Sequence, residues 1–243
     1  MHVEERVAVV TGGSRGIGQA ISERLAGAGM RVVIGSRGEE AAERVVKRIK
    51  DAGGQATAVP ADITRPAAVR ELFDAAEDYY GRVDVWVNNA GTATGAPIAQ
   101  TTDEDFELHF AANVRGTFVA LRECARRIRD HGRIILVSSA LTVAPLPGRA
   151  LLAAGKAAGD QLARTLAWEL GARSVTVNSI LPGLTRTDAI SAVPPPVLAD
   201  AEARTPLGRL GEPADIADIA AFLASDDARW ITAQTLHAAG GMI

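Results

Sequence analysis

Short apolar runs alternate with helical stretches along nearly the whole chain, and this alternation constrains the fold more than any other sequence feature. The apolar runs are Val7–Val10, Arg31–Gly35, Ala56–Pro60, Val83–Val87, Arg133–Val137, Val175–Ile180 and Thr235–His237. Apolar residues recur at helical spacing in Ile17–Ala28, Glu39–Ala52, Pro66–Tyr80, Phe106–Arg129, Arg149–Leu170 and Pro213–Ala224. Nearly all-apolar runs are typical of strands buried on both faces of a parallel sheet. The order therefore predicts an α/β fold, a doubly wound parallel sheet of about seven strands flanked by helices, in one domain over residues 1–243.

Composition and charge indicate which classes of binding partner and which cellular location to expect. The chain has 243 residues, 47% of them hydrophobic, and a formal net charge of -3, so its charge does not point to nucleic acid or to an anionic membrane. Cys124 is the single cysteine, which excludes an internal disulfide and is typical of a reducing cytosol. Met1–Arg6 is too charged for a signal peptide, and no apolar run approaches membrane-spanning length. We therefore expect a cytoplasmic protein that acts on a small molecule.

A glycine-rich turn follows the first predicted strand and leads into a helix. It reads Thr11-Gly12-Gly13-Ser14-Arg15-Gly16-Ile17-Gly18. Glycines allow a sharp turn and let a pyrophosphate approach the free amides at a helix N-terminus. In a doubly wound sheet, ligands bind beyond the carboxyl ends of the strands, where this turn lies. The turn therefore predicts a dinucleotide site.

The turn resembles the T-G-x-x-x-G-x-G signature of the short-chain dehydrogenase/reductase family, and further landmarks of that family follow in order. They are Asp62, Asn88-Asn89-Ala90-Gly91, Asn113, Ser138-Ser139, Pro182-Gly183 with Thr187, and Arg209-Leu210-Gly211-Glu212-Pro213, the last similar to bacterial 3-oxoacyl reductase-like members. The resemblance covers essentially the whole chain and implies a Rossmann-type fold. It implies cofactor contacts at Gly12, Ser14, Arg15, Gly16, Ile17, Gly18, Ser36, Arg37, Asp62, Ile63, Asn89, Ala90, Gly91, Lys156, Pro182, Gly183 and Thr187.

The end of the second predicted strand indicates which dinucleotide is bound. An NAD site usually has Asp or Glu there to hold the ribose hydroxyls. This chain has Ser36-Arg37 instead, and Arg15 supplies a second cation on the same side. A guanidinium pairs well with a phosphate, so we expect NADP(H).

The tyrosine on which the family's chemistry depends is absent. The resemblance implies a proton-transferring tyrosine in Y-x-x-x-K, a serine thirteen residues before it and a helix asparagine. The serine, lysine and asparagine correspond to Ser139, Lys156 and Asn113. Leu152 stands at the tyrosine position, and leucine can neither give nor take a proton. The chain's two tyrosines, Tyr79 and Tyr80, close the third predicted helix at the opposite end of the sheet.

Few other side chains offer acid–base chemistry. His109 lies four residues before Asn113 and is expected to be a packed or interface histidine. Thr142 and Arg149 flank the presumed substrate cleft, where either could orient an anion or a water. One cysteine and scattered histidines predict no metal site.

Three hypotheses for the activity stay open. The first is an NADPH-dependent reductase of a carbonyl or quinone-type, polyketide-like substrate, in which the proton comes from water or from the substrate's own hydroxyl. The second is a non-redox enzyme on the same scaffold, such as a cyclase or dehydratase. The third is a non-catalytic NADP(H)-binding partner subunit or sensor.

A substrate lid is expected at about 186–206, where Pro194-Pro195-Pro196 and many alanines suggest a mobile, apolar cover and hence an apolar or aromatic substrate. The family resemblance also implies a homotetramer or homodimer formed through the two long helices.

Overall fold

In a computed structural model, the seven strands of the described residues form one parallel sheet in the order β3-β2-β1-β4-β5-β6-β7. The structure describes residues 5–191 and 193–243; positions 1–4 and 192, which fall within the expected domain and lid, lie outside the described residues. The strands are β1 Val7–Thr11, β2 Arg31–Ser36, β3 Gln55–Pro60, β4 Val85–Asn88, β5 Arg133–Val137, β6 Thr176–Pro182 and β7 Thr235–Ala238. The predicted doubly wound, Rossmann-type α/β fold is confirmed.

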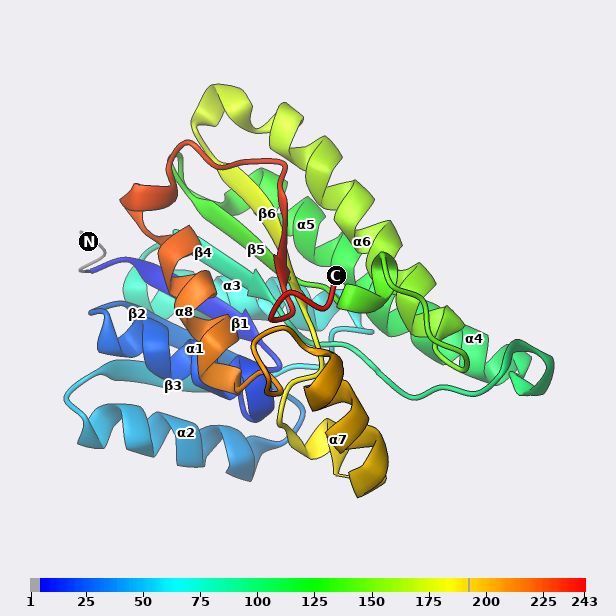
Figure 1. The fold of residues 1–243 in the computed structure, drawn as a ribbon. Helices are drawn as coiled ribbons and strands as arrows, with labels where there is room; N and C mark the ends of the chain where they lie inside the picture. The colour runs from blue at the N-terminus through cyan, green and yellow to red at the C-terminus, as the bar shows by residue number, and fades with distance from the viewer. Residues whose placement is uncertain (1–4, 192) are drawn as a thin grey trace.

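Helices cover both faces of the sheet (Figure 1). On one face lie α1 (Gly16–Gly27), α2 (Glu39–Asp51) and α8 (Pro213–Ala224), which bury residues such as Leu25, Val45 and Ala220 against the strands. On the other face lie α3 (Pro66–Tyr80), α5 (Gly116–Arg127) and α6 (Ala150–Glu169), with Phe73 and Leu166 in their core. The apolar stripes recognised in the sequence therefore face the sheet, as their spacing requires.

The long helix predicted at Phe106–Arg129 is wrong as one element. Helix α4 (Asp103–Phe110) begins earlier, because Thr102 and Asp105 form a reciprocal capping box at its start. A π-helical turn, Ala111–Arg115, then separates α4 from α5. Such turns lie at functional sites in many helices, and this one contains Asn113.

The region expected to be the lid contains a helix that the sequence analysis did not predict, α7 (Pro195–Arg204). Pro195 stands in its first turn, a position that tolerates the missing amide. Arg186, before α7, pairs with Glu212, after it, at 3.1 Å. In Figure 1 this helix, in gold, stands apart from the helices that cover the sheet. Shorter 3-10 turns lie at Ile98–Gln100, Ala140–Thr142, Gly171–Arg173, Asp188–Ile190 and Asp226–Ala228.

No helix among the described residues has the length and hydropathy needed to cross a membrane. No group of three or more histidine, cysteine, aspartate or glutamate side chains in that part of the chain is arranged to hold a metal ion.

Candidate cofactor and active site

Glycines shape the turn between β1 and α1. Gly12 and Gly16 have φ angles of 64° and 53°, in the left-handed region that side chains disfavour. A Cβ on Gly18 would lie 2.2 Å from the carbonyl oxygen of Gly12, so the helix start needs glycine for this close approach. Arg15 at the N-cap makes no side-chain capping bond, which leaves the first amides of α1 available to an anion. The turn therefore fits the pyrophosphate of a dinucleotide.

Thr11 and Asn89 tie this turn to the end of β4. The Thr11 Oγ1 atom accepts hydrogen bonds from the backbone N–H groups of Asn89 and Ala90 at 3.0 and 3.1 Å. Asn89 Nδ2 donates to the carbonyl oxygens of Thr11 and Gly12, both at 3.1 Å. The predicted cofactor residues of the first and fourth strand ends therefore form one hydrogen-bonded unit.

The residues at the end of β2 place a hydroxyl and a guanidinium group near the glycine turn. Ser36 is buried, and its Oγ lies 2.7 Å from Ser14 Oγ in the glycine turn. Arg37 and Arg15 are exposed. The pKa of Asp62 is lowered, chiefly by the hydrogen bond from the Thr64 backbone N–H, and the charge of Arg37 contributes. Arg37 thus lies near both the Ser14–Ser36 contact and the Asp62 carboxylate.

The loop after β6 returns to the glycine turn. Pro182 ends the strand, and Gly183 N–H donates to the Ala238 carbonyl oxygen at 3.1 Å. The Thr187 Cγ2 atom lies 3.2 Å from the place a Cβ on Gly16 would occupy. Gly16 and Thr187, 171 positions apart in the chain, therefore meet at one edge of the sheet, as the predicted cofactor site requires.

Asn113, Gly91 and Lys156 form a tightly packed cluster beside these predicted cofactor residues. Asn113 is 1% exposed, and its amide accepts from Thr92 N–H at 3.1 Å and donates to the Thr92 carbonyl at 3.0 Å. A Cβ on Gly91 would lie 2.5 Å from Asn113 Oδ1 and 3.4 Å from Lys156 Nζ. Gly155 is needed as well, since its Cβ would come within 2.9 Å of Asn113 Cβ.

Lys156 and Asp160 lie one turn apart on α6, with Lys156 half-buried and Asp160 buried. Lys156 Nζ donates to the Val137 carbonyl oxygen at 2.7 Å, and burial lowers the pKa of this lysine to about 8 against the opposing charge of Asp160. Asp160 accepts from Ser138 Oγ at 2.8 Å, and burial raises the pKa of its carboxyl group. The sequence analysis missed Asp160, although its position four residues after Lys156 was a signal for such a pair.

Ser139 and Leu152 differ in their capacity to form hydrogen bonds. Ser139 Oγ accepts the Leu141 N–H at 3.2 Å, which leaves its own O–H free to donate to a substrate oxygen. Thr142 Oγ1 is occupied with the Ser139 carbonyl at 3.0 Å. Leu152 is 8% exposed on α6, one turn before Lys156, and presents only hydrocarbon.

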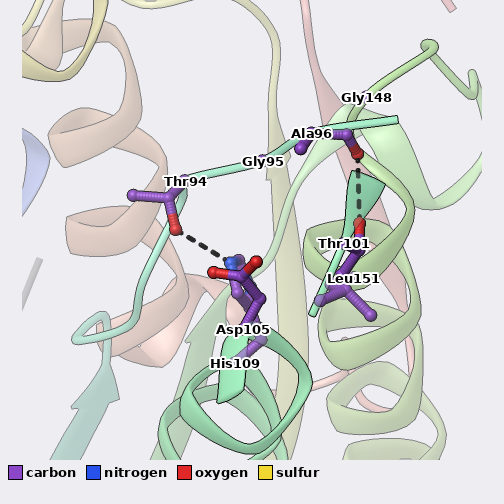
Figure 2. Close-up of a pocket in the computed structure, with 8 residues that line it drawn as sticks. All are labelled: Thr94, Gly95, Ala96, Thr101, Asp105, His109, Gly148 and Leu151. Carbon is purple, nitrogen blue, oxygen red and sulfur yellow. Dashed lines mark hydrogen bonds between the residues drawn. The ribbon is translucent and has the colours of Figure 1, made fainter. Parts of the chain in front are cut away.

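The structure also places the histidine, arginine and tyrosine candidates of the sequence. His109 is 1% exposed, which confirms that it is packed, and it contacts Thr94 rather than Asn113 beside a small pocket (Figure 2). Arg149 Nη1 donates to the Ala93 carbonyl at 2.8 Å and so joins two loops at the cleft. Tyr79 and Tyr80 form a tilted ring pair at the end of α3.

Comparison with known proteins agrees with this geometry. A family model described as enoyl-(acyl carrier protein) reductase matches residues 12–243. The chain is 37% identical to a versicolorin reductase of Emericella nidulans, covering 98% of this chain and 96% of the relative. It is also 37% identical to a hydroxynaphthalene reductase-like protein of Metarhizium brunneum, covering 98% and 95%.

A solved structure adds the fold to this likeness. A short-chain dehydrogenase from Burkholderia cenocepacia in complex with NADP superimposes with a TM-score of 0.94, at 36% identity, and the match covers 100% of this chain and 99% of that one. Fold, site geometry and sequence likeness agree over almost the full length. The chain belongs to the short-chain dehydrogenase/reductase family.

Proposed function

We propose that the protein is an NADPH-dependent reductase that acts on a carbonyl or quinone-type small molecule without a tyrosine proton donor. The observation that carries the proposal is the packing of Asn113, Gly91 and Lys156 beside the glycine turn, with Leu152 one helical turn before Lys156. Its relatives include reductases, and a neighbouring structure holds NADP. These findings support both the reaction class and the cofactor.

We assign separate cofactor-binding and substrate-binding roles to the residues of the site. NADPH, when bound, supplies the hydride. The first amides of α1, Ser36 and Arg37 hold its phosphates, and Lys156 binds the ribose next to the nicotinamide. Ser139 donates its O–H to the substrate oxygen, since the Leu141 N–H uses only a lone pair of Oγ and leaves the hydroxyl proton free.

Leu152 restricts which substrates can react. General acid catalysis is worth about 10²–10⁴ in rate, and Leu152 cannot supply it. A conjugated carbonyl, such as that of a quinone or a phenolic ring system, spreads the charge that develops on oxygen, so water or a hydroxyl of the substrate itself is a sufficient proton source. We propose an aromatic or quinone-type substrate for this reason.

A panel experiment tests the proposal against the two other hypotheses. The protein is incubated with NADPH and a set of ketones and quinones, and cofactor absorbance and products are followed together. We expect oxidation of NADPH matched by reduced product for conjugated substrates. Product formed with unchanged absorbance would indicate a cyclase or dehydratase, and tight NADPH binding without turnover would indicate a sensor or partner subunit.

We also propose that the chain acts in the cytoplasm as a homodimer or homotetramer. Family resemblance and exposed apolar residues on α5 and α6, Phe118 and Trp168, support self-association. Size-exclusion chromatography with light scattering tests it, and a monomer at micromolar concentration would contradict it.

A further inference from the structure

The Lys156 ammonium lies among groups that carry no charge. Its Nζ donates to the Val137 carbonyl oxygen at 2.7 Å, and the nearby Asn113 amide is occupied by the Thr92 backbone. Leu152, one turn earlier on α6, presents only hydrocarbon. An ammonium group in such surroundings is costly unless a negative charge lies near it.

Asp160 places a carboxylate beside this ammonium. It is 3% exposed and follows Lys156 by one helical turn, so the two side chains share a face of α6. Both bind the end of β5, since Lys156 contacts the Val137 carbonyl and Asp160 Oδ2 accepts from Ser138 Oγ at 2.8 Å. Because Val137 and Ser138 are consecutive residues, the ammonium and the carboxylate lie against the same short segment of chain.

One carboxylate oxygen of Asp160 has no hydrogen-bond partner. Oδ1 is buried and makes no hydrogen bond to any described residue, whereas Oδ2 is held by Ser138. A carboxyl group whose role was only to accept from Ser138 would not need a second buried oxygen, which costs free energy when it is left unpaired. The arrangement therefore suits an electrostatic role for Asp160.

The charges on α6 support this role in both directions. Burial raises the pKa of Asp160, while the hydroxyl groups of Ser179 on β6 and Ser138 after β5 and the charges of Lys156 and Arg164 lower it. Burial lowers the pKa of Lys156 to about 8, and Asp160 is the charged group among the described residues that raises it. Each of the two charges thus stabilises the other.

We infer that Asp160 is a positioning residue of the cofactor site, the buried counter-charge that keeps the Lys156 side chain charged and in place. The inference rests on the proposed function, because that function assigns cofactor binding to Lys156. It adds a residue that acts on the cofactor through Lys156, so cofactor affinity near neutral pH depends on a carboxylate one helical turn away.

The few lysines of the chain allow Lys156 to be titrated directly. They are Lys47, Lys50 and Lys156, and the first two are exposed on α2. NMR of protein isotope-labelled in its lysine side chains follows each of them with pH, and Lys156→Met identifies the signal of Lys156. We expect Lys156 to titrate near pH 8 in the wild-type protein and at least about one pH unit lower in Asp160→Asn, because an amide of the same size carries no charge.

Three further variants separate the counter-charge from a general disturbance of α6. Glu169→Gln removes a carboxylate from the exposed far end of the same helix and should leave the Lys156 midpoint unchanged. Asp160→Glu keeps the carboxylate and should keep most of the wild-type midpoint. Asp160→Ala should lower the midpoint as Asp160→Asn does, and it replaces that variant if the buried amide prevents folding. Thermal unfolding checks that each variant folds.

NADPH affinity over the same pH range connects the counter-charge to the cofactor. We expect affinity to fall as Lys156 loses its charge, and to do so at correspondingly lower pH in Asp160→Asn. An unshifted Lys156 midpoint in folded Asp160→Asn or Asp160→Ala, or an equal shift in Glu169→Gln, would overturn the inference at the pairing itself. A shifted midpoint with pH-independent NADPH binding would overturn it differently, by showing that the pair exists but that Lys156 does not bind the cofactor.

Discussion

Arg37 is the residue to which we assign the cofactor preference. It is exposed just after β2, beside the buried Ser36, and the position carries no carboxylate that would hold ribose hydroxyls. We predict that Arg37→Asp weakens NADPH binding by at least about tenfold and leaves NADH binding nearly unchanged, because only NADPH carries the 2′-phosphate. Fluorescence titration with both cofactors measures this, and equal weakening of the two would show that Arg37 does not select between them.

We predict that Lys156 makes cofactor binding depend on pH. Burial depresses its pKa to about 8, so its ammonium is charged below that pH and becomes neutral as the pH rises through it. We predict that NADPH affinity falls by about tenfold between neutral and strongly alkaline pH, as a charge-assisted contact is lost.

Lys156→Met is the control for this pH dependence. Its affinity should be low and flat over the same range, because no group titrates at that position. A wild-type profile as flat as that of the variant would mean that Lys156 does not bind the cofactor.

At the scale of elements, two of the three glycines in helix α1 have opposite packing environments. Gly18 packs against the glycine turn, where an added Cβ would lie 2.2 Å from a backbone oxygen, whereas a Cβ on Gly27 would meet nothing within 4 Å. We predict that Gly18→Ala destabilises the protein by more than about 2 kcal/mol, a cost typical of an overpacked site. Gly27→Ala should be neutral or stabilise by up to about 1 kcal/mol through helix propensity.

Urea denaturation of the two variants measures this difference. Thermal shifts with NADPH add a second readout, since the turn that Gly18 supports should lose its ligand response. A Gly18→Ala variant as stable as Gly27→Ala would contradict the packing described for the start of α1.

Some helices and strands could be predicted from the sequence and others could not. The strands and the helices α3 and α8 follow their apolar patterns closely, because periodicity reports which face of an element is buried. The apolar pattern did not predict the π turn at Ala111–Arg115, where Asn113 bonds the Thr92 backbone of another segment, because periodicity does not report such tertiary contacts. Helix α7 lacks buried residues and so had no apolar stripe to reveal it.

In the candidate site too, some residues could be predicted from the sequence and some contacts could not. Motifs located Gly12, Ser139 and Lys156, because backbone turns and cofactor contacts need particular residue types at fixed spacing. The hydrogen bond from Ser138 to Asp160 and the pocket beside His109 arise from tertiary packing, and a single sequence does not report them.

For the whole molecule, the parallel order of the sheet brings the carboxyl ends of its strands to one edge. The glycine turn, Asn89 and the loop after β6 meet there, and the Lys156 cluster lies beside them. The central claim is that this assembly transfers hydride although Leu152 stands at the place of the family's phenol.

Deuterium transfer tests that claim most directly. The protein is incubated with NADPH deuterated at the transferring carbon and with each conjugated ketone of the panel, because an alcohol formed from a ketone keeps the transferred deuterium on carbon whereas a hydroquinone does not. The products are examined by mass spectrometry. The account predicts a reduced product that carries one deuterium, formed in step with cofactor oxidation. A product without deuterium, or no cofactor oxidation with any member of the panel, would contradict it.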